Sequence, residues 1–119
     1  MTSKHQLGRQ GEAAAAAFLI QNGHQILEQN YRYLKAEVDV IALKKNCLIA
    51  VEIKTRSSDF FGPPESFLKP KQQQRIVTAI DYFVKQNNLN VEVRFDVISV
   101  LKKGGNFQIK HIKNAFYHF

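Results

Sequence analysis

The chain has 119 residues, a length suited to one compact domain, and its 45% hydrophobic content with nine Phe and four Tyr is sufficient for a core without disulfides. Seventeen Lys and Arg against ten Asp and Glu give a formal net charge of +7, which favours a polyanionic partner. The single cysteine excludes an internal disulfide, and no apolar run reaches the roughly 20 residues of a membrane span. We therefore expect residues 1–119 to form a single cytoplasmic domain with no membrane partner.

Apolar periodicity and turn residues predict the order helix, three strands, helix, two strands. The predicted segments are a helix at 4–22, a strand at 24–33, a hairpin at 37–55 that turns near Lys45-Asn46, a loop at 56–67, a helix from about Pro70, a strand at 91–101 and a last strand in FQIKHI. Gly8 and Gly11 in the first helix predict the close approach of another backbone or of a ligand. The order predicts an α/β domain with a mixed β-sheet of about five strands flanked by helices.

Two acidic residues interrupt the apolar hairpin, Asp39 in EVDVIAL and Glu52 in LIAVEIK. If the chain turns at Lys45-Asn46, opposed positions sum to 91 and Glu52 lies directly across from Asp39. Like charges in this arrangement are destabilising unless something neutralises them, and an unpaired carboxylate in an apolar strand loses hydration. The pair therefore predicts a site for a hard divalent cation, Mg²⁺ or Mn²⁺.

Two further charged residues have both a functional and a structural interpretation. Lys54 shares a strand face with Glu52, where it would hold an attacking water or stabilise negative charge, but in the same register it also faces Glu37 as an ordinary ion pair. Glu12 lies beside the apolar stripe of the first helix, and from its position alone it is either an inward-leaning carboxylate or a surface residue of the early turns.

The basic residues that follow the hairpin are the candidate nucleic-acid contacts. Lys71 and Arg75 fall on the predicted exposed side of the second helix, where they would follow a phosphate backbone or form a solvated face. We add Arg56 and Lys69, which flank the predicted loop, to this set. The four histidines do not have the spacing of zinc ligands, and no cofactor other than the divalent cation is predicted.

The sequence resembles the YraN-type family of small bacterial proteins along nearly its whole length. The segments that carry the resemblance are GRQGEAAAAAFL, NYRY, EVDVIAL, VEIKTR, the FG-P element from Phe61 to Pro63, and RFDVISV. That family in turn resembles the PD-(D/E)xK nuclease superfamily, especially archaeal Holliday-junction resolvases. This resemblance implies a restriction-endonuclease-like core.

The resemblance also assigns roles to residues. It makes Asp39 and Glu52 metal-binding acids, Lys54 the catalytic lysine of the E-x-K element, and Glu12 the acid of the first helix that completes the metal site. Glu37 and Gln72 are auxiliary residues in this scheme. The proline that often precedes the first acid of the superfamily is absent, and Ala36 replaces a more usual glycine, which should affect only a turn.

The leading hypothesis from the sequence is a Mg²⁺- or Mn²⁺-dependent nuclease that hydrolyses DNA phosphodiester bonds, on branched or single-stranded substrates. The alternative hypothesis is a non-catalytic nucleic-acid-binding module with the same fold. A third hypothesis is a structural or protein-interaction domain. The likeness to resolvases implies a homodimer, although no sequence feature fixes an interface.

Overall fold

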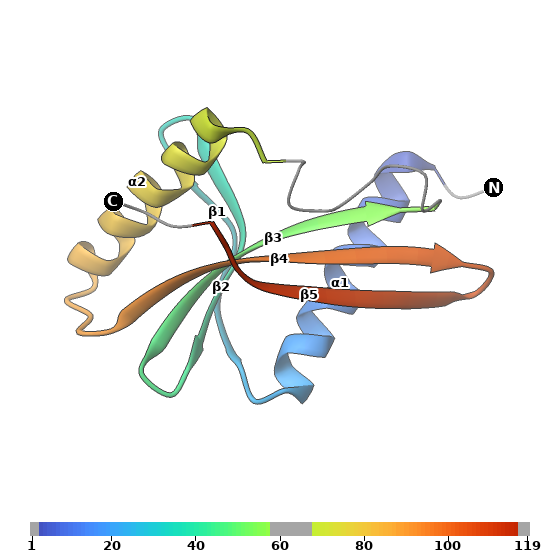
Figure 1. Cartoon of the computed structure of the whole chain (residues 1–119), viewed down its shortest axis with the longest axis horizontal. Helices are drawn as coiled ribbons and strands as arrows, with labels where there is room; N and C mark the ends of the chain where they lie inside the picture. The colour runs from blue at the N-terminus through green and yellow to red at the C-terminus, as the bar shows by residue number, and fades with distance from the viewer. Residues whose placement is uncertain (1–2, 58–67, 117–119) are drawn as a thin grey trace.

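The computed structural model describes residues 3–57 and 68–116. The predicted order of helices and strands is confirmed: α1 (Lys4–Gln21), β1 (Gln25–Tyr33), β2 (Ala36–Lys44), β3 (Cys47–Arg56), α2 (Pro70–Gln86), β4 (Glu92–Lys103) and β5 (Asn106–Phe116). Most of the loop predicted at 56–67, with the FG-P element, lies outside the described residues. Figure 1 shows the elements in chain order.

The five strands form one sheet in the order β1-β2-β3-β4-β5. Neighbouring strands are antiparallel except β3 and β4, which are parallel because the chain between them crosses over through α2. The fold class predicted from the sequence, a mixed α/β sheet of five strands flanked by helices, is confirmed. Within the described parts of the chain, no helix has the length and apolar character needed to cross a bilayer.

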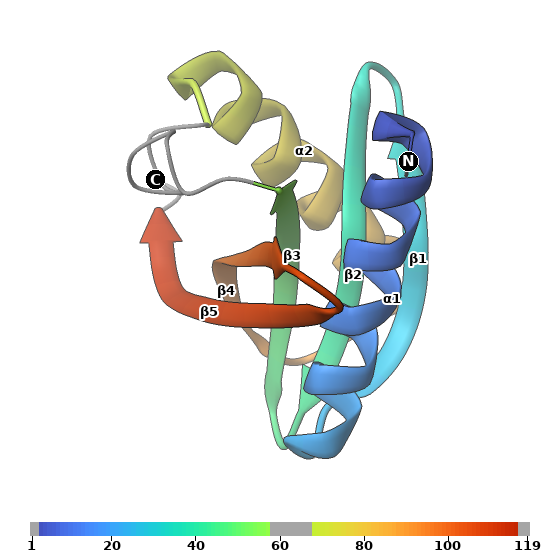
Figure 2. The same cartoon turned by 90° about the vertical axis from the view of Figure 1, so that its right-hand side faces the viewer.

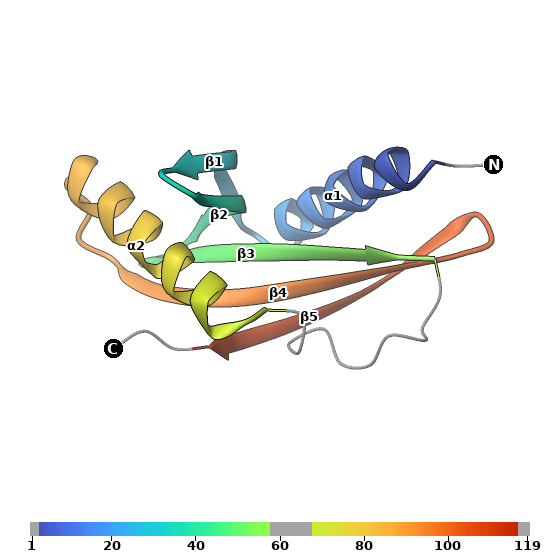
Figure 3. The ribbon, with the colours of Figure 1, turned by 90° about the horizontal axis from the view of Figure 1, so that it is seen from above.

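The two helices lie on opposite faces of the sheet, as the view from above shows (Figure 3). On one face, α1 contributes Ala15 and Leu19 to a core with Val51 and other residues of the central strands. On the other face, α2 contributes Ile76 and Ile80 to a second core. The sheet therefore has two hydrophobic cores, one under each helix, and its central strands are covered on both sides.

Local signals in the sequence account for the helix ends. Ser3 caps α1, since its hydroxyl accepts the Gln6 amide at 3.0 Å while the Gln6 side chain accepts the Ser3 amide at 3.1 Å. Gly23 follows the helix with a φ of +87°, a conformation that glycine adopts without strain. Pro70 begins α2, as predicted, because its missing N–H costs nothing in a first turn.

Candidate functional site

The hairpin of β2 and β3 has the predicted register but ends before the predicted pair of Asp39 and Glu52. The backbone pairs run from Lys44 opposite Cys47 to Val40 opposite Val51, and every pair sums to 91 as predicted. Beyond Val51 the strands separate, and Figure 2 shows them leaving their shared turn side by side and diverging toward the other end. Asp39 and Glu52 are the first residues past this last pair, so the prediction that they form a directly opposed backbone pair is wrong.

The two carboxylates close the start of the gap by binding the backbone of the opposite strand. The Asp39 amide donates to Glu52 Oε2 at 3.1 Å, and the Ile53 amide donates to Asp39 Oδ2 at 2.7 Å. Each bond joins a side chain of one strand to the backbone of the other, at a point where no backbone pair joins the two strands. The structure therefore brings Asp39 and Glu52 together, as predicted, by side-chain bonds and not by strand pairing.

The separation coincides with a turn of the β2 backbone opposite an irregular residue of β1. Asn30 has a φ of +54° and lies between the β1–β2 pairs Gln29–Val40 and Tyr31–Val38, which places it opposite Asp39. Val38 packs in the core under α2, whereas Val40 packs in the core under α1. Residues two apart in a regular strand face the same side, so the backbone of β2 must turn at Asp39.

Burial has a large effect on the ionisation of both acids. Glu52 is 5% exposed. Burial, followed by the negative charge of Asp39, raises the pKa of Glu52 from 4.5 to about 8. Burial also raises the pKa of Asp39 from 3.8 to about 6, and the charges of Glu12 and Glu37 add to this effect. The pair therefore does not carry two full negative charges at neutral pH unless positive charge compensates them.

Lys54 supplies some of that positive charge. It is half-buried on β3, two residues beyond Glu52, and its ammonium lowers the pKa of both Glu52 and Asp39. The alternative prediction, an ion pair between Lys54 and Glu37, is wrong. Glu37 instead binds Arg32, its partner on β1, with Nη2 and Oε2 3.0 Å apart.

A close contact between α1 and β3 brings Glu12 toward the carboxylates. A Cβ atom added at the buried Gly11 would overlap Thr55 Oγ1 and lie 2.8 Å from Thr55 Cβ, so glycine permits a close approach, although of a side chain and not of the predicted backbone or ligand. At Gly8 no atom lies within 4 Å of such a Cβ, so the predicted approach of another backbone is wrong there, and the approach of a ligand stays a prediction. Glu12 is half-buried, and its charge is one of those that raise the pKa of Asp39.

The three acids nevertheless do not converge. In the described ranges 3–57 and 68–116, no three side chains of His, Cys, Asp or Glu are close enough together to hold a metal ion. Asp39 and Glu52 are the assembled part of the predicted metal site, and Glu12 lies within electrostatic range of it.

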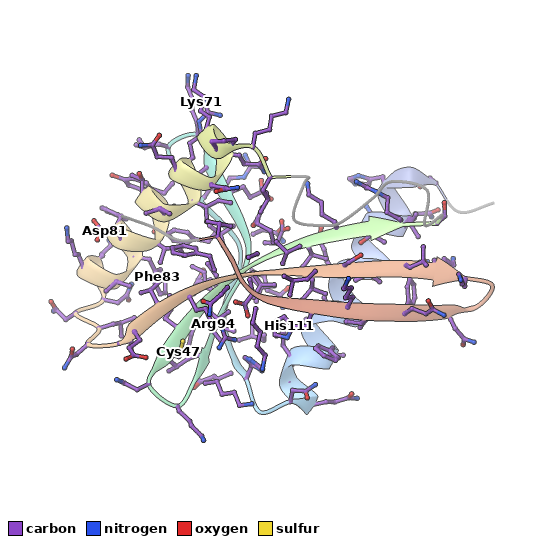
Figure 4. All side chains as sticks on the ribbon, in the orientation of Figure 1. Cys47, Lys71, Asp81, Phe83, Arg94 and His111 are labelled. Atoms are coloured by element: carbon purple, nitrogen blue, oxygen red, sulfur yellow. The ribbon has the colours of Figure 1, made fainter. Side chains whose placement is uncertain are left out.

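The predicted nucleic-acid contacts divide into two groups. Lys69, Lys71 and Arg75 line a cleft of about 410 Å³ at the start of α2, and the auxiliary residues Glu37 and Gln72 line it too. Figure 4 shows Lys71 extending from this end of α2. Arg56 is not among the lining residues of that cleft; it belongs to the end of β3.

A second polar cluster, centred on Asp96 of β4, was not predicted from the sequence. Asp96 is fully buried, and its carboxylate accepts both the Nε and Nη2 hydrogen bonds of Arg94 at 2.9 Å. His111 Nε2 lies 2.7 Å from Asp96 Oδ2, and the Asn114 amide donates to Oδ1 at 3.1 Å. Figure 4 shows Arg94 and His111 close together at the β4–β5 pair. The available signal was Arg94-x-Asp96, two opposite charges on one face of a strand.

This cluster is an internal support of the sheet. Burial raises the pKa of Asp96, but hydrogen bonds from His111, Arg94 and Asn114 together outweigh it and hold the pKa of that carboxyl below its ordinary value of 3.8. An ionised Asp96 with every partner in place ties β4 to β5 and leaves the carboxylate no free role.

Comparison with known proteins places the chain in a family. The sequence profile of the "Uncharacterised protein family UPF0102" matches residues 11–100, the stretch that carries Glu12, Asp39, Glu52 and Lys54. The chain belongs to this family. A UPF0102 protein of Christiangramia forsetii is 48% identical over the full length of both chains. UPF0102 proteins of Flavobacterium psychrophilum and Flavobacterium johnsoniae are 46% and 42% identical, again over the whole of both chains.

Among solved structures, one similarity is with Pyrococcus furiosus SfsA in complex with Ca²⁺. The identity is 13% and the TM-score 0.37, over 93% of this chain and 64% of that one. A similarity at this level supports no inference about function.

Proposed function

We propose that this UPF0102 protein is a metal-dependent nuclease that hydrolyses phosphodiester bonds in DNA. The observation that supports the proposal best is the pair formed by the half-buried Asp39 and the buried Glu52 at the point where β2 and β3 separate, with the charge of Lys54 acting on both. Two buried carboxylates are costly to ionise together unless a cation compensates them. Perturbed pKa values of this kind are concentrated at functional sites.

The donor groups fit a hard divalent cation. Mg²⁺ and Mn²⁺ prefer oxygen ligands and bind through one or two carboxylates, with water and substrate phosphate as the remaining ligands. Asp39 and Glu52 each commit one oxygen to a backbone amide, which fixes the orientation of the carboxylate. Glu12 is the third acid of this proposal. The bound ion would polarise the phosphodiester and compensate the charge that develops on it.

The other groups of the site would position the substrate. The Lys54 ammonium can donate hydrogen bonds to an attacking water or to a phosphate oxygen, and it stabilises negative charge at either. Lys69, Lys71 and Arg75 lie at the start of α2, where they would neutralise neighbouring phosphates of the strand. The proposal includes a cytoplasmic location and, for branched substrates, a homodimer that cuts two strands.

The direct test is cleavage of labelled single-stranded, duplex, flap and four-way DNA with Mg²⁺ or Mn²⁺. We expect cleavage that EDTA abolishes and that Lys54→Ala reduces by at least about a hundredfold, the loss typical of an electrostatic group in a transition state. Lys113→Ala is the matched control, because Lys113 is an exposed lysine of β5, a strand that pairs with neither β2 nor β3. Failure to cleave any of these substrates would refute the proposal.

A second candidate function is nucleic-acid binding without catalysis. It is favoured by the hydrogen bonds of Asp39 and Glu52 to backbone amides, which give both carboxylates a structural role. Titration with Mn²⁺ separates the two candidates. DNA affinity that is indifferent to Mn²⁺ and to Asp39→Asn would favour the binding module.

A further inference from the structure

A pocket of about 560 Å³ lies between the β1–β2 turn and α2. The turn contributes Tyr33, Leu34 and Ala36 to its lining, and α2 contributes Lys71 and Arg75 among others. Figure 1 shows the turn beside the first part of α2. The volume is within the range of roughly 300–1,000 Å³ that is typical of ligand pockets.

Leu34 is an unusual residue for its position in the fold. It occupies the first position of the two-residue β1–β2 turn with a φ of +55°, a conformation that favours glycine and asparagine over leucine. Its side chain is also 83% exposed. The two-residue turn itself requires the positive φ, so the feature that calls for an explanation is a large apolar residue exposed to water at the mouth of a pocket.

An aromatic surface continues from Leu34 into the pocket. The ring of Tyr33 stacks on that of Tyr82 of α2, with centroids 4.2 Å apart and planes 19° from parallel. Because Tyr82 holds the ring of Tyr33 in place, a flat ligand would meet a surface that is already ordered. Aromatic rings of this kind are the stacking platforms of proteins that bind single strands.

Three cations surround this apolar surface. Lys35, Lys71 and Arg75 line the pocket, and none of them forms an ion pair within the part of the chain that the structure describes. The same three residues line the neighbouring cleft, which extends to Glu37. The charge of Glu37 raises the pKa of Asp39, two residues away on β2. The pocket and the cleft therefore share these three cations, and Glu37 of the cleft is two residues from Asp39 in sequence.

We propose that this pocket takes one unpaired base of a nucleic-acid strand, while Lys35, Lys71 and Arg75 bind the adjacent phosphates. The inference rests on the proposed function and narrows its substrate to single-stranded or locally unpaired nucleic acid. A base inside a duplex has both faces covered by its neighbours, so only an unpaired base can present a face to Tyr33 and Leu34. The cations Lys35, Lys71 and Arg75 would contact the phosphates of the strand, and the apolar surface of Tyr33 and Leu34 would contact the base.

The test measures binding without metal, so that cleavage has no influence on it. The probes are fluorescein-labelled oligodeoxythymidine and a blunt duplex, both about 12 nucleotides long, in EDTA at moderate salt. We expect the wild-type protein to prefer the single strand, and Leu34→Asn to weaken that binding about tenfold with duplex binding unchanged. Asparagine is favoured at this turn position, so the variant should fold at least as stably as the wild type.

Ile20→Asn is the matched control. Ile20 is another exposed apolar residue, 58% exposed, and lies on α1, across the sheet from α2, so the substitution makes the same uncharged change away from the pocket. If both variants weaken binding equally, or if Leu34→Asn leaves single-strand binding intact, the pocket proposal fails. Phosphatidylglycerol vesicles are a third probe. If Leu34→Asn weakened binding to these vesicles and left single-strand binding unchanged, the pocket would bind a lipid and the proposal would fail.

The outcome is separable from that of the nuclease proposal. Single-strand binding that depends on Leu34, in a protein that cleaves nothing, would support the pocket and refute the nuclease. Cleavage with no dependence of binding on Leu34 would support the nuclease and refute the pocket.

Discussion

Replacing Glu52 by glutamine should stabilise the metal-free protein at alkaline pH. Glu52 is 5% exposed, and burial with the charge of Asp39 raises its pKa from 4.5 to about 8. Folding therefore favours the protonated, neutral form of Glu52. Its contribution to the free energy of unfolding is complete below pH 4.5 and is lost as the pH rises from 4.5 through about 8. Glutamine has no charge to lose, and its amide oxygen can still accept the Asp39 amide.

The interval between the two pKa values sets the size of the effect. Each pH unit between 4.5 and about 8 is worth about 1.4 kcal/mol, so the whole interval corresponds to roughly 5 kcal/mol. Because Asp39 ionises over much of the same range and shares the repulsion, we expect Glu52→Gln to gain on the order of 3 kcal/mol at about pH 8.5 and little at about pH 5.

Urea unfolding in EDTA at both pH values measures this gain. The wild type should lose stability between the two, whereas Glu52→Gln should lose much less. Glu28→Gln is the control, because Glu28 is an exposed acid of β1 and should follow the wild type. If the free energy of unfolding fell by the same amount between the two pH values in the wild type and in Glu52→Gln, the raised pKa of Glu52 would be refuted.

Three further predictions concern the metal, the second polar cluster and the helix contact. Mn²⁺ should raise the melting temperature of the wild type and not that of Glu52→Gln, and an equal rise in both would place binding elsewhere. Asp96→Asn should cost about 3 kcal/mol in urea unfolding at neutral pH, because it removes the charge that pairs with Arg94. That contribution is present above pH 3.8 and lost as the pH falls further, so the variant should show a weaker acid dependence. Gly11→Ala should cost about 1–3 kcal/mol, and Thr55→Ala should recover part of it; additive losses in the double variant would contradict the contact.

The hairpin register was predictable because its determinants are local. A polar two-residue turn between apolar runs fixes which positions face each other, and the pairs from Lys44–Cys47 to Val40–Val51 follow the predicted arithmetic. The separation beyond Val51 was not predictable in the same way, because it involves Asn30, a residue of another strand with a positive φ. Sequence patterns within the hairpin contain no information about that conformation.

The same distinction explains the other differences. The β2–β3 register alone pairs Glu37 with Lys54. The ion-pair partner in the structure is Arg32, which lies opposite Glu37 in the β1–β2 register. Asp96 draws partners from β5, fifteen or more residues away, including the backbone of Asn114, which has a φ of +53°. Partners that come from distant strands can be found only once the sheet order is known.

The early end of the β2–β3 ladder has a mechanical consequence. Beyond Val40 and Val51 no backbone pair joins the two strands, so the wedge between them can widen without breaking any part of the ladder. Two side-chain hydrogen bonds, those of Asp39 and Glu52, hold its narrow end. Each bond uses one oxygen of its carboxylate, so a cation on the other oxygens would leave both bonds in place and hold the narrow end of the wedge closed, while the far end could still widen.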